Sequence, residues 1–243
     1  MAETIIGRNA VLEALKSNRE IEKITLAKGA EGSVKQIAAK ARDKHIPIYY
    51  SDKARMDKAA SGGAHQGVIA VVSDYKYCTV DDILDRAAQR GEDPFIIILD
   101  GLEDPHNLGA IMRTAECAGV HGIVIPKRRS VSVTETVAKT SAGAVEYMLC
   151  AKVTNIANEI EKLKEKGVWV GACDMGPDLY YRQVLKGPIA IVIGAEGAGI
   201  SRLVKEKCDF VVSIPMKGNI TSLNASNAAS ILMYEVVRQR MDI

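Results

Sequence analysis

Short apolar runs alternate with longer segments in which apolar residues recur every three or four positions over residues 94–243. A continuous apolar run predicts a strand covered on both faces of a sheet, and the longer period predicts an amphipathic helix. The expected strands span 95–99, 122–125, 145–150, 168–172, 189–193 and 210–214. The expected helices span 108–117, 134–141, 155–166 and 224–240. Strands that alternate with helices indicate an α/β fold with a mostly parallel sheet.

The first third of the chain has a shorter version of this pattern. Helices are expected at 7–15 and 33–43, and strands at 21–26, 46–50 and 68–72. Residues 74–93 are polar and charged, which is typical of a connector between domains, although 80–88 could form a short helix. We therefore expect a small α/β domain over 1–73, a linker over 74–93 and a larger α/β domain over 94–243.

The composition narrows the class of protein. Apolar residues make up 47% of the 243 positions, as in an ordinary globular protein with a full core. No apolar run approaches the roughly 18 residues of a membrane span, and no leader pattern is present, so no membrane association is expected. The five cysteines are widely spaced and form no C-x-x-C pair, which argues against a disulfide framework and a metal site. A reducing cytoplasm suits this usage.

Charge is distributed unevenly along the chain. Residues 1–73 contain 12 Lys and Arg against 8 Asp and Glu, a net charge of +4, whereas residues 74–243 contain 20 against 22, a net charge of −2. A basic module joined to a near-neutral one is compatible with a nucleic-acid partner.

Polar loops follow most of the expected strands, and in a parallel sheet these loops emerge at one edge, where such folds bind ligands. The loop 194–199 (GAEGAG) holds one carboxylate, Glu196, among glycines and alanines. A cation and several small polar groups could join it from two other regions: Asn107, Arg113, Ser222 and Asn224.

Simpler interpretations of these residues stay open at this point. Asn107 suits the N-cap of a helix that begins at Leu108, Arg113 could be a solvated helix residue, and Glu196 could cap a helix near Ser201. The run GAEGAG is neither the dinucleotide fingerprint nor a phosphate-binding loop, because the glycine spacing differs and no Lys-Ser or Lys-Thr follows.

Three segments together resemble the SpoU/TrmH branch of the SPOUT superfamily of RNA methyltransferases. They are 107–115 (NLGAIMRTA), 193–197 (IGAEG) with Gly199, and 214–216 (IPM) leading to 222–226 (SLNAS). The N-terminal segments 5–15 (IIGRNAVLEAL) and 65–68 (HQGV) are similar to the substrate-binding domain of the subgroup that modifies a guanosine in large-subunit (23S) ribosomal RNA.

The resemblance implies a trefoil-knotted C-terminal α/β domain with a parallel sheet, behind a small N-terminal α/β RNA-binding domain. It also implies a homodimer and S-adenosylmethionine as the cofactor. The residues expected to hold that cofactor are Ala172, Gly194, Gly197, Ile214, Met216 and Leu223.

The implied reaction is methyl transfer to a ribose 2′-hydroxyl of RNA. The family assigns the activation of this hydroxyl to the arginine that is Arg113 here. Because an arginine side chain holds its proton at neutral pH, it is a poor base, and we expect Arg113 to stabilise the developing alkoxide or bind a phosphate. Glu196 would pair with Arg113, Asn107 would orient Arg113 or the substrate, and Ser222 and Asn224 would position ribose or cofactor groups.

RNA would be held mainly by the basic N-terminal domain, and the loop 127–129 (KRR) would add to this grip. Three hypotheses follow from the resemblance. The first is 2′-O-methylation of large-subunit ribosomal RNA. The others are 2′-O-methylation of transfer RNA, and a non-catalytic RNA-binding or assembly factor.

Overall fold

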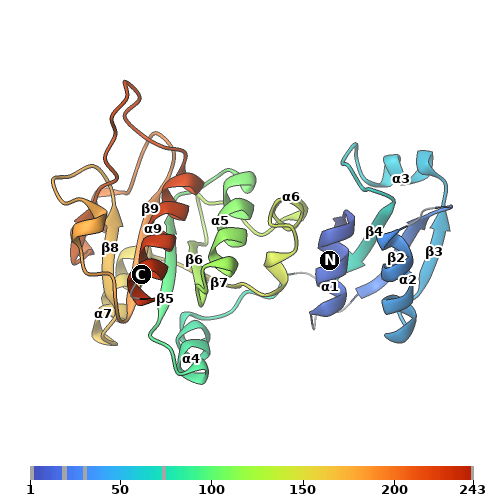
Figure 1. Cartoon of the computed structure of the whole chain (residues 1–243), viewed down its shortest axis with the longest axis horizontal. Coiled ribbons are helices and arrows are strands. Elements are labelled where there is room, and N and C mark those ends of the chain that lie inside the picture. The colour runs from blue at the N-terminus through green and yellow to red at the C-terminus, as the bar shows by residue number, and fades with distance from the viewer. Residues whose placement is uncertain (1–2, 18–20, 30–31, 73–74, 242–243) are drawn as a thin grey trace. The chain divides into compact units, whose positions relative to one another are not determined.

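The structure of the chain, a computed structural model, describes residues 3–17, 21–29, 32–72 and 75–241 (Figure 1). Its contacts define two units. The first consists of Met1–Lys76 and Val133–Tyr147, and the second of Tyr77–Ser132 and Met148–Ile243. No helix in the described ranges is long and apolar enough to cross a membrane.

The first unit is built on a four-stranded sheet with the order β1-β4-β2-β3. Its strands are β1 (Glu3–Ile6), β2 (Ile21–Ala27), β3 (Ile48–Ser51) and β4 (Val68–Val72). Its helices are α1 (Arg8–Lys16), α2 (Ser33–Asp43), α3 (Lys53–Ala59) and α6 (Glu135–Thr140), with the 3-10 helix η1 (Ala144–Glu146). The pattern predicted α1, α2 and the last three strands. It missed β1 and α3, which are too short for a clear period.

Two motif segments of this unit lie against each other. The backbone N–H of Arg8 donates to Gln66 Oε1 at 3.1 Å, and Arg8 Nε donates to the Gln66 carbonyl at 2.9 Å. The ring of His65 accepts from the N–H of Gly67 at 2.9 Å and contacts Asp57 at 2.9 Å. The segment HQG therefore holds the start of α1 in place.

The second unit contains a six-stranded sheet with the order β10-β8-β9-β5-β6-β7, and every neighbouring pair in it is parallel. The strands are β5 (Phe95–Asp100), β6 (Gly122–Pro126), β7 (Leu149–Val153), β8 (Trp169–Cys173), β9 (Ile189–Gly194) and β10 (Phe210–Val212). The helices are α4 (Val80–Arg90), α5 (Pro105–Cys117), α7 (Ile156–Glu165), α8 (Arg202–Lys207) and α9 (Ala225–Arg240), with the 3-10 helix η2 (Tyr180–Arg182). The predicted parallel sheet is confirmed.

Both faces of this sheet are covered. Ile96 and Ile98 of β5 belong to a buried cluster that also takes in side chains from α4, α7 and α8. Figure 1 shows α5 and α9 side by side over the other face, where Ser230 donates to Thr114 Oγ1 at 3.2 Å. Burying one large aliphatic side chain in such a layer stabilises the fold by about 1.5–3 kcal/mol.

The strand expected at 145–150 is displaced. Ala144–Glu146 form η1, and β7 begins only at Leu149. The backbone at Ala142 and Gly143 has positive φ values of 52° and 97°, which end α6 and start a turn rather than a strand.

The segment expected to be a linker contains α4, which a Thr79–Asp82 capping box begins. Val80, Ile83 and Ala87 of this helix are buried, so it is part of the packing of the second unit. The boundaries at residues 73 and 93 stay a prediction.

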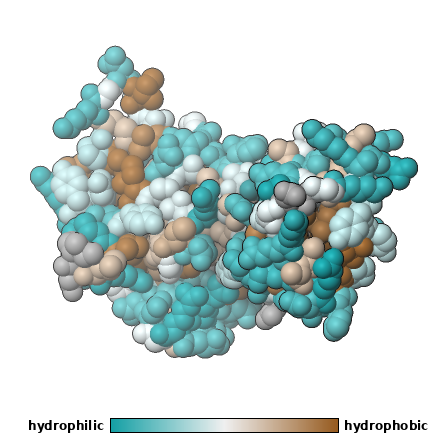
Figure 2. Space-filling model, turned by 45° about the vertical axis from the view of Figure 1, so that its right-hand side comes forward, coloured by the Kyte–Doolittle hydropathy of each residue, from teal (hydrophilic) through white to brown (hydrophobic). Residues whose placement is uncertain are grey.

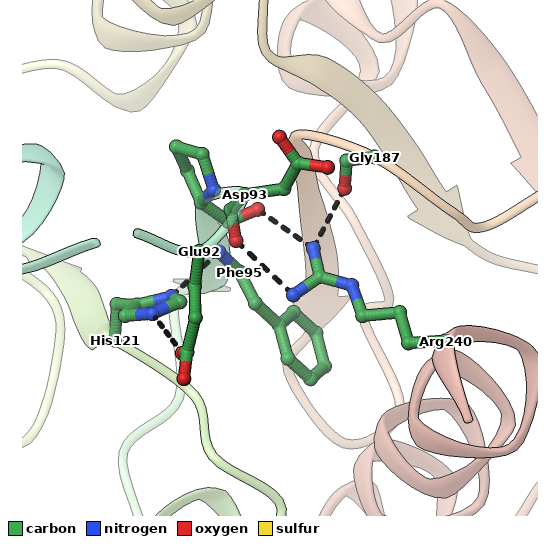
Figure 3. Close-up of polar contacts among 7 residues, drawn as sticks. Glu92, Asp93, Phe95, His121, Gly187 and Arg240 are labelled. Carbon is green, nitrogen blue, oxygen red and sulfur yellow. Dashed lines mark hydrogen bonds and ion pairs between the residues drawn. The ribbon is translucent and has the colours of Figure 1, made fainter. Parts of the chain in front are cut away.

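A polar cluster ties the last helix to the start of the central strands (Figure 3). Arg240 of α9 donates to the carbonyls of Asp93 at 3.1 Å, Pro94 at 3.1 Å and Gly187 at 2.6 Å. These carbonyls precede β5 and β9, so the cluster lies at the end of the sheet opposite the loops that follow the strands. It fixes the C-terminal end of α9 against the sheet.

Candidate active site

The loop 194–199 folds back on itself at the end of β9. Ala195 and Gly199 exchange two backbone hydrogen bonds, of 3.1 and 2.9 Å. A Cβ atom on Gly194 would lie 2.2 Å from the backbone carbon of Gly199, so only glycine fits there. Gly197 and Gly199 have φ values of +77° and +67°, which glycine adopts without strain. The sequence thus builds a tight loop that presents Glu196.

Glu196 is held by two asparagines from distant parts of the chain. Asn107 Nδ2 donates to Glu196 Oε1 at 3.0 Å, and Asn224 Nδ2 donates to the same oxygen at 2.5 Å. Asn224 Nδ2 also donates to Asn107 Oδ1 at 2.9 Å. Three of the five predicted catalytic residues therefore form one hydrogen-bonded cluster.

Asn107 is not the N-cap of its helix, contrary to the simpler interpretation. Helix α5 begins at Pro105, and Asp104 caps it by accepting from the N–H of His106 at 2.9 Å. Proline at the first helical position explains the earlier start. Asn107 lies in the first turn, only 5% exposed, where its side chain reaches Glu196.

Asn224 has two tasks. Its Oδ1 accepts from the backbone N–H groups of Ser226 at 2.9 Å and Asn227 at 3.4 Å, which caps α9. Because Oδ1 faces the helix, its amide nitrogen is directed at Asn107 and Glu196. The start of the last helix and the orientation of the carboxylate are therefore coupled through one side chain.

Glu196 does not cap the helix near Ser201, which was the alternative for this residue. Helix α8 begins after Ser201 without a side-chain cap, and the N–H of Ser201 itself donates to Asp100 Oδ2, at the end of β5, at 2.7 Å. Sequence reasoning missed this role of Asp100. A carboxylate directly after a buried strand was the available signal.

Two cavities flank the loop 194–199. The first, of about 490 Å³, is called the acidic cavity because four carboxylates and one cation line it: Asp100, Glu103, Asp104, Glu196 and Arg129. The second, of about 550 Å³, is called the apolar cavity. Five of the six residues predicted to hold the cofactor line the apolar cavity, together with Ser222 and Asn224: Gly194, Gly197, Ile214, Met216 and Leu223. Glu196 lines both cavities, so the asparagine–carboxylate cluster stands at their common wall.

The sixth predicted cofactor residue, Ala172, does not line the apolar cavity. It is fully buried in the core, and its neighbour Cys173 lines the cavity instead. Burial raises the pKa of the Cys173 thiol to about 11, with a smaller contribution from Asp174. The thiol is therefore protonated at neutral pH, so Cys173 shapes the cavity rather than acting as a nucleophile.

The rim of the apolar cavity is apolar on one side and charged on the other. The loop before α9 rises from this edge, and Figure 2 shows apolar surface along it. Met216, Ile220 and Leu223 of this loop are 38%, 76% and 38% exposed. On the charged side, Lys205 pairs with Asp174 at 2.7 Å.

Arg113 does not join the cluster, contrary to the expected pair with Glu196. It is exposed on α5, lines neither cavity, and makes no hydrogen bond or ion pair in the part of the chain that the structure describes. Instead of Arg113, two neutral amides donate to Glu196 Oε1. Within the same described residues, Glu196 Oε2 has no hydrogen-bond partner.

Two family models match the chain. Residues 94–234 match the SpoU rRNA Methylase family, and residues 4–78 match RNA 2'-O ribose methyltransferase substrate binding. The chain therefore belongs to the SpoU rRNA methylase family. The N-terminal domain expected from the segments IIGRNAVLEAL and HQGV is confirmed as a substrate-binding domain by the second match.

Relatives and solved structures agree with this assignment. YacO of Bacillus subtilis (strain 168), named as a TrmH family tRNA/rRNA methyltransferase, is 50% identical over 97% of this chain and 95% of its own length. A Staphylococcus haemolyticus (strain JCSC1435) protein of the same family name is 45% identical over 98% of this chain and 96% of its own. The SpoU methyltransferase AviRb from Streptomyces viridochromogenes is similar in fold, with a TM-score of 0.84 at 23% identity over 99% of this chain and 90% of AviRb.

AviRb has also been solved in complex with the cofactor AdoMet, and that structure gives a TM-score of 0.83. These likenesses confirm the expected fold class, and the family membership makes the chain an RNA methyltransferase of the SpoU/TrmH type.

Proposed function

We propose that the protein methylates a ribose 2′-hydroxyl of RNA with S-adenosylmethionine, and that its substrate is a guanosine in large-subunit ribosomal RNA. The hydrogen-bonded cluster of Asn107, Glu196 and Asn224 supports this proposal most directly. It places one oriented carboxylate at the wall between an apolar cavity and an acidic one. A methyl donor and an acceptor hydroxyl need this kind of paired arrangement.

The apolar cavity suits S-adenosylmethionine. Ile214, Met216 and Leu223 offer apolar surface to an adenine ring, and the close backbone of residues 194–199 offers peptide groups to the ribose and amino-acid parts. The complex of AviRb with AdoMet supports the same assignment. When bound, the cofactor supplies a methyl group activated by its sulfonium. Of the predicted cofactor residues, Ala172 contributes only from the core beneath the cavity.

The acidic cavity suits the ribose. A carboxylate accepts hydrogen bonds, so Glu196 Oε2 can hold the 2′-hydroxyl by its proton while Asn107 and Asn224 keep the carboxylate fixed. Ser222, which lines the apolar cavity, is placed to position a ribose or cofactor group. Four carboxylates repel a phosphate, so the phosphates beside the target nucleotide are held outside this cavity.

Arg113 is then best placed as a phosphate ligand. It is exposed and has no partner among the described residues, as a cation awaiting an anionic ligand would be. The residues 1–73 would capture the RNA, residues 94–243 would carry out methyl transfer, and residues 74–93 would join them. We further propose a homodimer that covers exposed apolar side chains on α9, where Tyr234 is 49% exposed.

The test is incubation with labelled S-adenosylmethionine and transcripts of large-subunit ribosomal RNA or transfer RNA, followed by digestion to nucleosides. Labelled 2′-O-methylguanosine from the ribosomal transcript supports the proposal. Label in transfer RNA alone selects the second hypothesis. Calorimetry that shows no binding of S-adenosylmethionine would instead favour a non-catalytic RNA-binding factor.

A further inference from the structure

A third cavity, of about 460 Å³, lies in the second unit where α4, β7 and α7 meet. Four lysines from three parts of the chain line it, so we call it the lysine cavity: Lys127, Lys152, Lys162 and Lys166. It belongs to neither cavity described above, and methyl transfer as proposed does not use it.

The charges in this cavity are only partly balanced within the chain. Asp81 pairs with Lys166, and Glu159 pairs with Lys162 at 3.1 Å. Lys152 donates to Ser132 at 2.8 Å and lies 4.0 Å from the centre of the Tyr77 ring. These are neutral partners, so four lysines face two carboxylates. Lys162 and Lys166 are exposed, and water weakens their ion pairs, so each lysine can exchange its carboxylate for another anion.

Two helices begin at the same cavity. Thr79 caps α4, Asn155 caps α7, and both caps line the cavity. The positive ends of two helix dipoles therefore lie at this cavity, where Asp81 and Asp82 in the first turn of α4 and Glu159 in that of α7 offset part of their potential.

A basic loop connects the lysine cavity to the acidic cavity. Lys127 lines the former and Arg129 lines the latter, with Arg128 between them. All three are exposed, and none has a side-chain hydrogen bond or ion pair within the described ranges. Lys127 follows β6 directly, and its N–H donates to Val153 at the end of β7. The loop thus runs along the edge of the sheet that also carries Glu196.

We propose that the RNA strand beside the target nucleotide crosses residues 127–129 and places a backbone phosphate in the lysine cavity. This inference rests on the proposed function and extends it from the target ribose to the neighbouring strand. The target ribose enters a cavity of four carboxylates that repels phosphates, so the adjoining phosphates need cations close by. The unpartnered cations of residues 127–129 and the four lysines beyond them supply these along one edge.

The test measures RNA affinity with the full-length protein and a transcript of large-subunit ribosomal RNA at several salt concentrations. A Lys127→Gln/Lys162→Gln variant should raise Kd about tenfold and should reduce the slope of log Kd against log salt by about 1 to 2. Binding of S-adenosylmethionine should stay unchanged, because neither lysine lines the apolar cavity.

Two control variants separate this role from a general loss of charge or fold. Lys164→Gln removes a cation from the same helix that pairs with Asp209 at 2.8 Å and lies outside the cavity. It should leave Kd within about twofold. Glu159→Gln removes the carboxylate that pairs with Lys162 inside the cavity and should therefore tighten RNA binding. If these residues only stabilise the fold, the Glu159→Gln variant and the Lys127→Gln/Lys162→Gln variant should both bind RNA more weakly.

A second measurement uses the unaltered protein. Lysine acetylation read by mass spectrometry should show Lys127 and Lys162 protected by RNA and Lys164 still reactive. The inference is wrong if the wild type and the double variant have equal salt slopes, or if RNA protects Lys164 alone from acetylation. It is also wrong if inorganic phosphate protects Lys127 and Lys162 but RNA does not. Wild-type protein that binds RNA without methylating it would count against the proposed function. The RNA affinities of the lysine variants would still test whether the lysine cavity holds a phosphate.

Discussion

Asn107 donates to the carboxylate of Glu196 at 3.0 Å although 89 positions separate the two residues in the chain. The bond joins the first turn of α5 to the loop after β9, and these elements follow neighbouring strands of the sheet. It leaves Glu196 Oε1 with two amide donors and Oε2 free to accept from a ligand.

Replacing Glu196 by Gln should lower kcat about 100-fold with little change in the affinity for S-adenosylmethionine. Glutamine retains the size of the side chain but removes the charge and gives one terminal atom donor character, so the hydroxyl loses its acceptor. Single-turnover methylation of the transcript measures kcat, and calorimetry measures cofactor affinity. Glu206→Gln is the matched control, because among the residues that the structure describes Glu206 pairs only with Arg202 on α8. A rate equal to that of wild type would rule out this role for Glu196.

Replacing Gly194 by Ala should abolish cofactor binding and destabilise the protein by about 1–3 kcal/mol, the usual cost of overpacking. The added Cβ would lie 2.2 Å from the Gly199 carbon and 2.4 Å from the Ile200 nitrogen, so the loop would have to open. Urea unfolding and calorimetry measure the two effects. Gly218→Ala provides the comparison, because a Cβ there meets nothing within 4 Å. Retained cofactor affinity in the Gly194 variant would show that the loop is not a wall of the cofactor site.

The periodic pattern predicted the sheet of the second unit because its strands are buried on both faces, and such strands are continuous apolar runs. Phe95 to Leu99 are all buried, as are Ile189 to Ile193. The pattern failed where a turn of positive φ displaced β7 and where short elements such as α3 span too few residues to show a period. The trefoil knot came from the family resemblance alone, because periodicity contains no information about threading.

The sequence predicted which residues form the candidate site but not which of them contact one another. The sequence placed Asn107, Glu196 and Asn224 on loops of one edge, and they do meet. The family resemblance implied a pair of Glu196 with Arg113, but in the fold two neutral amides donate to Glu196. Helix α5 begins at Pro105, three positions before Leu108, so Asn107 lies within the first turn rather than at the N-cap. The sequence placed Arg129 in a loop expected to help hold RNA, but its place in the wall of the acidic cavity beside Glu196 depends on tertiary structure.

An Arg113→Ala variant should lose most turnover while it still binds the cofactor. Arg113 lines no part of the apolar cavity, so cofactor affinity does not depend on it. Without its guanidinium the protein no longer holds a phosphate of the substrate, and the 2′-hydroxyl is misplaced. We expect kcat/KM to fall about 100-fold in methylation assays. Arg202→Ala serves as control, because this arginine is also exposed but pairs with Glu206 on its own helix. An unchanged kcat/KM for the Arg113 variant would exclude the residue from the reaction.

Stability should fall when the pH drops below about 6.5, through His121 at the far end of the sheet (Figure 3). The ring is fully buried; Nδ1 accepts from the N–H of Phe95 at 2.9 Å, so Nε2 carries the proton toward Glu92. Burial lowers the pKa of His121 below its ordinary 6.5, against the opposing effect of Glu92. His121 therefore takes up a proton near pH 6.5 in the unfolded chain and only at lower pH in the folded chain, so the free energy of unfolding decreases as the pH falls.

The measurement is the free energy of unfolding in urea at pH 8 and pH 5.5, for the wild type and for His121→Asn. Asparagine can still accept from Phe95 through Oδ1 but does not titrate, so the variant should lose less stability between the two pH values. His121 contacts Glu92 and Phe95, which flank the two carbonyls that accept from Arg240, so protonation should also loosen the C-terminal end of α9. Equal pH dependence of the two proteins would show that another group controls the acid response.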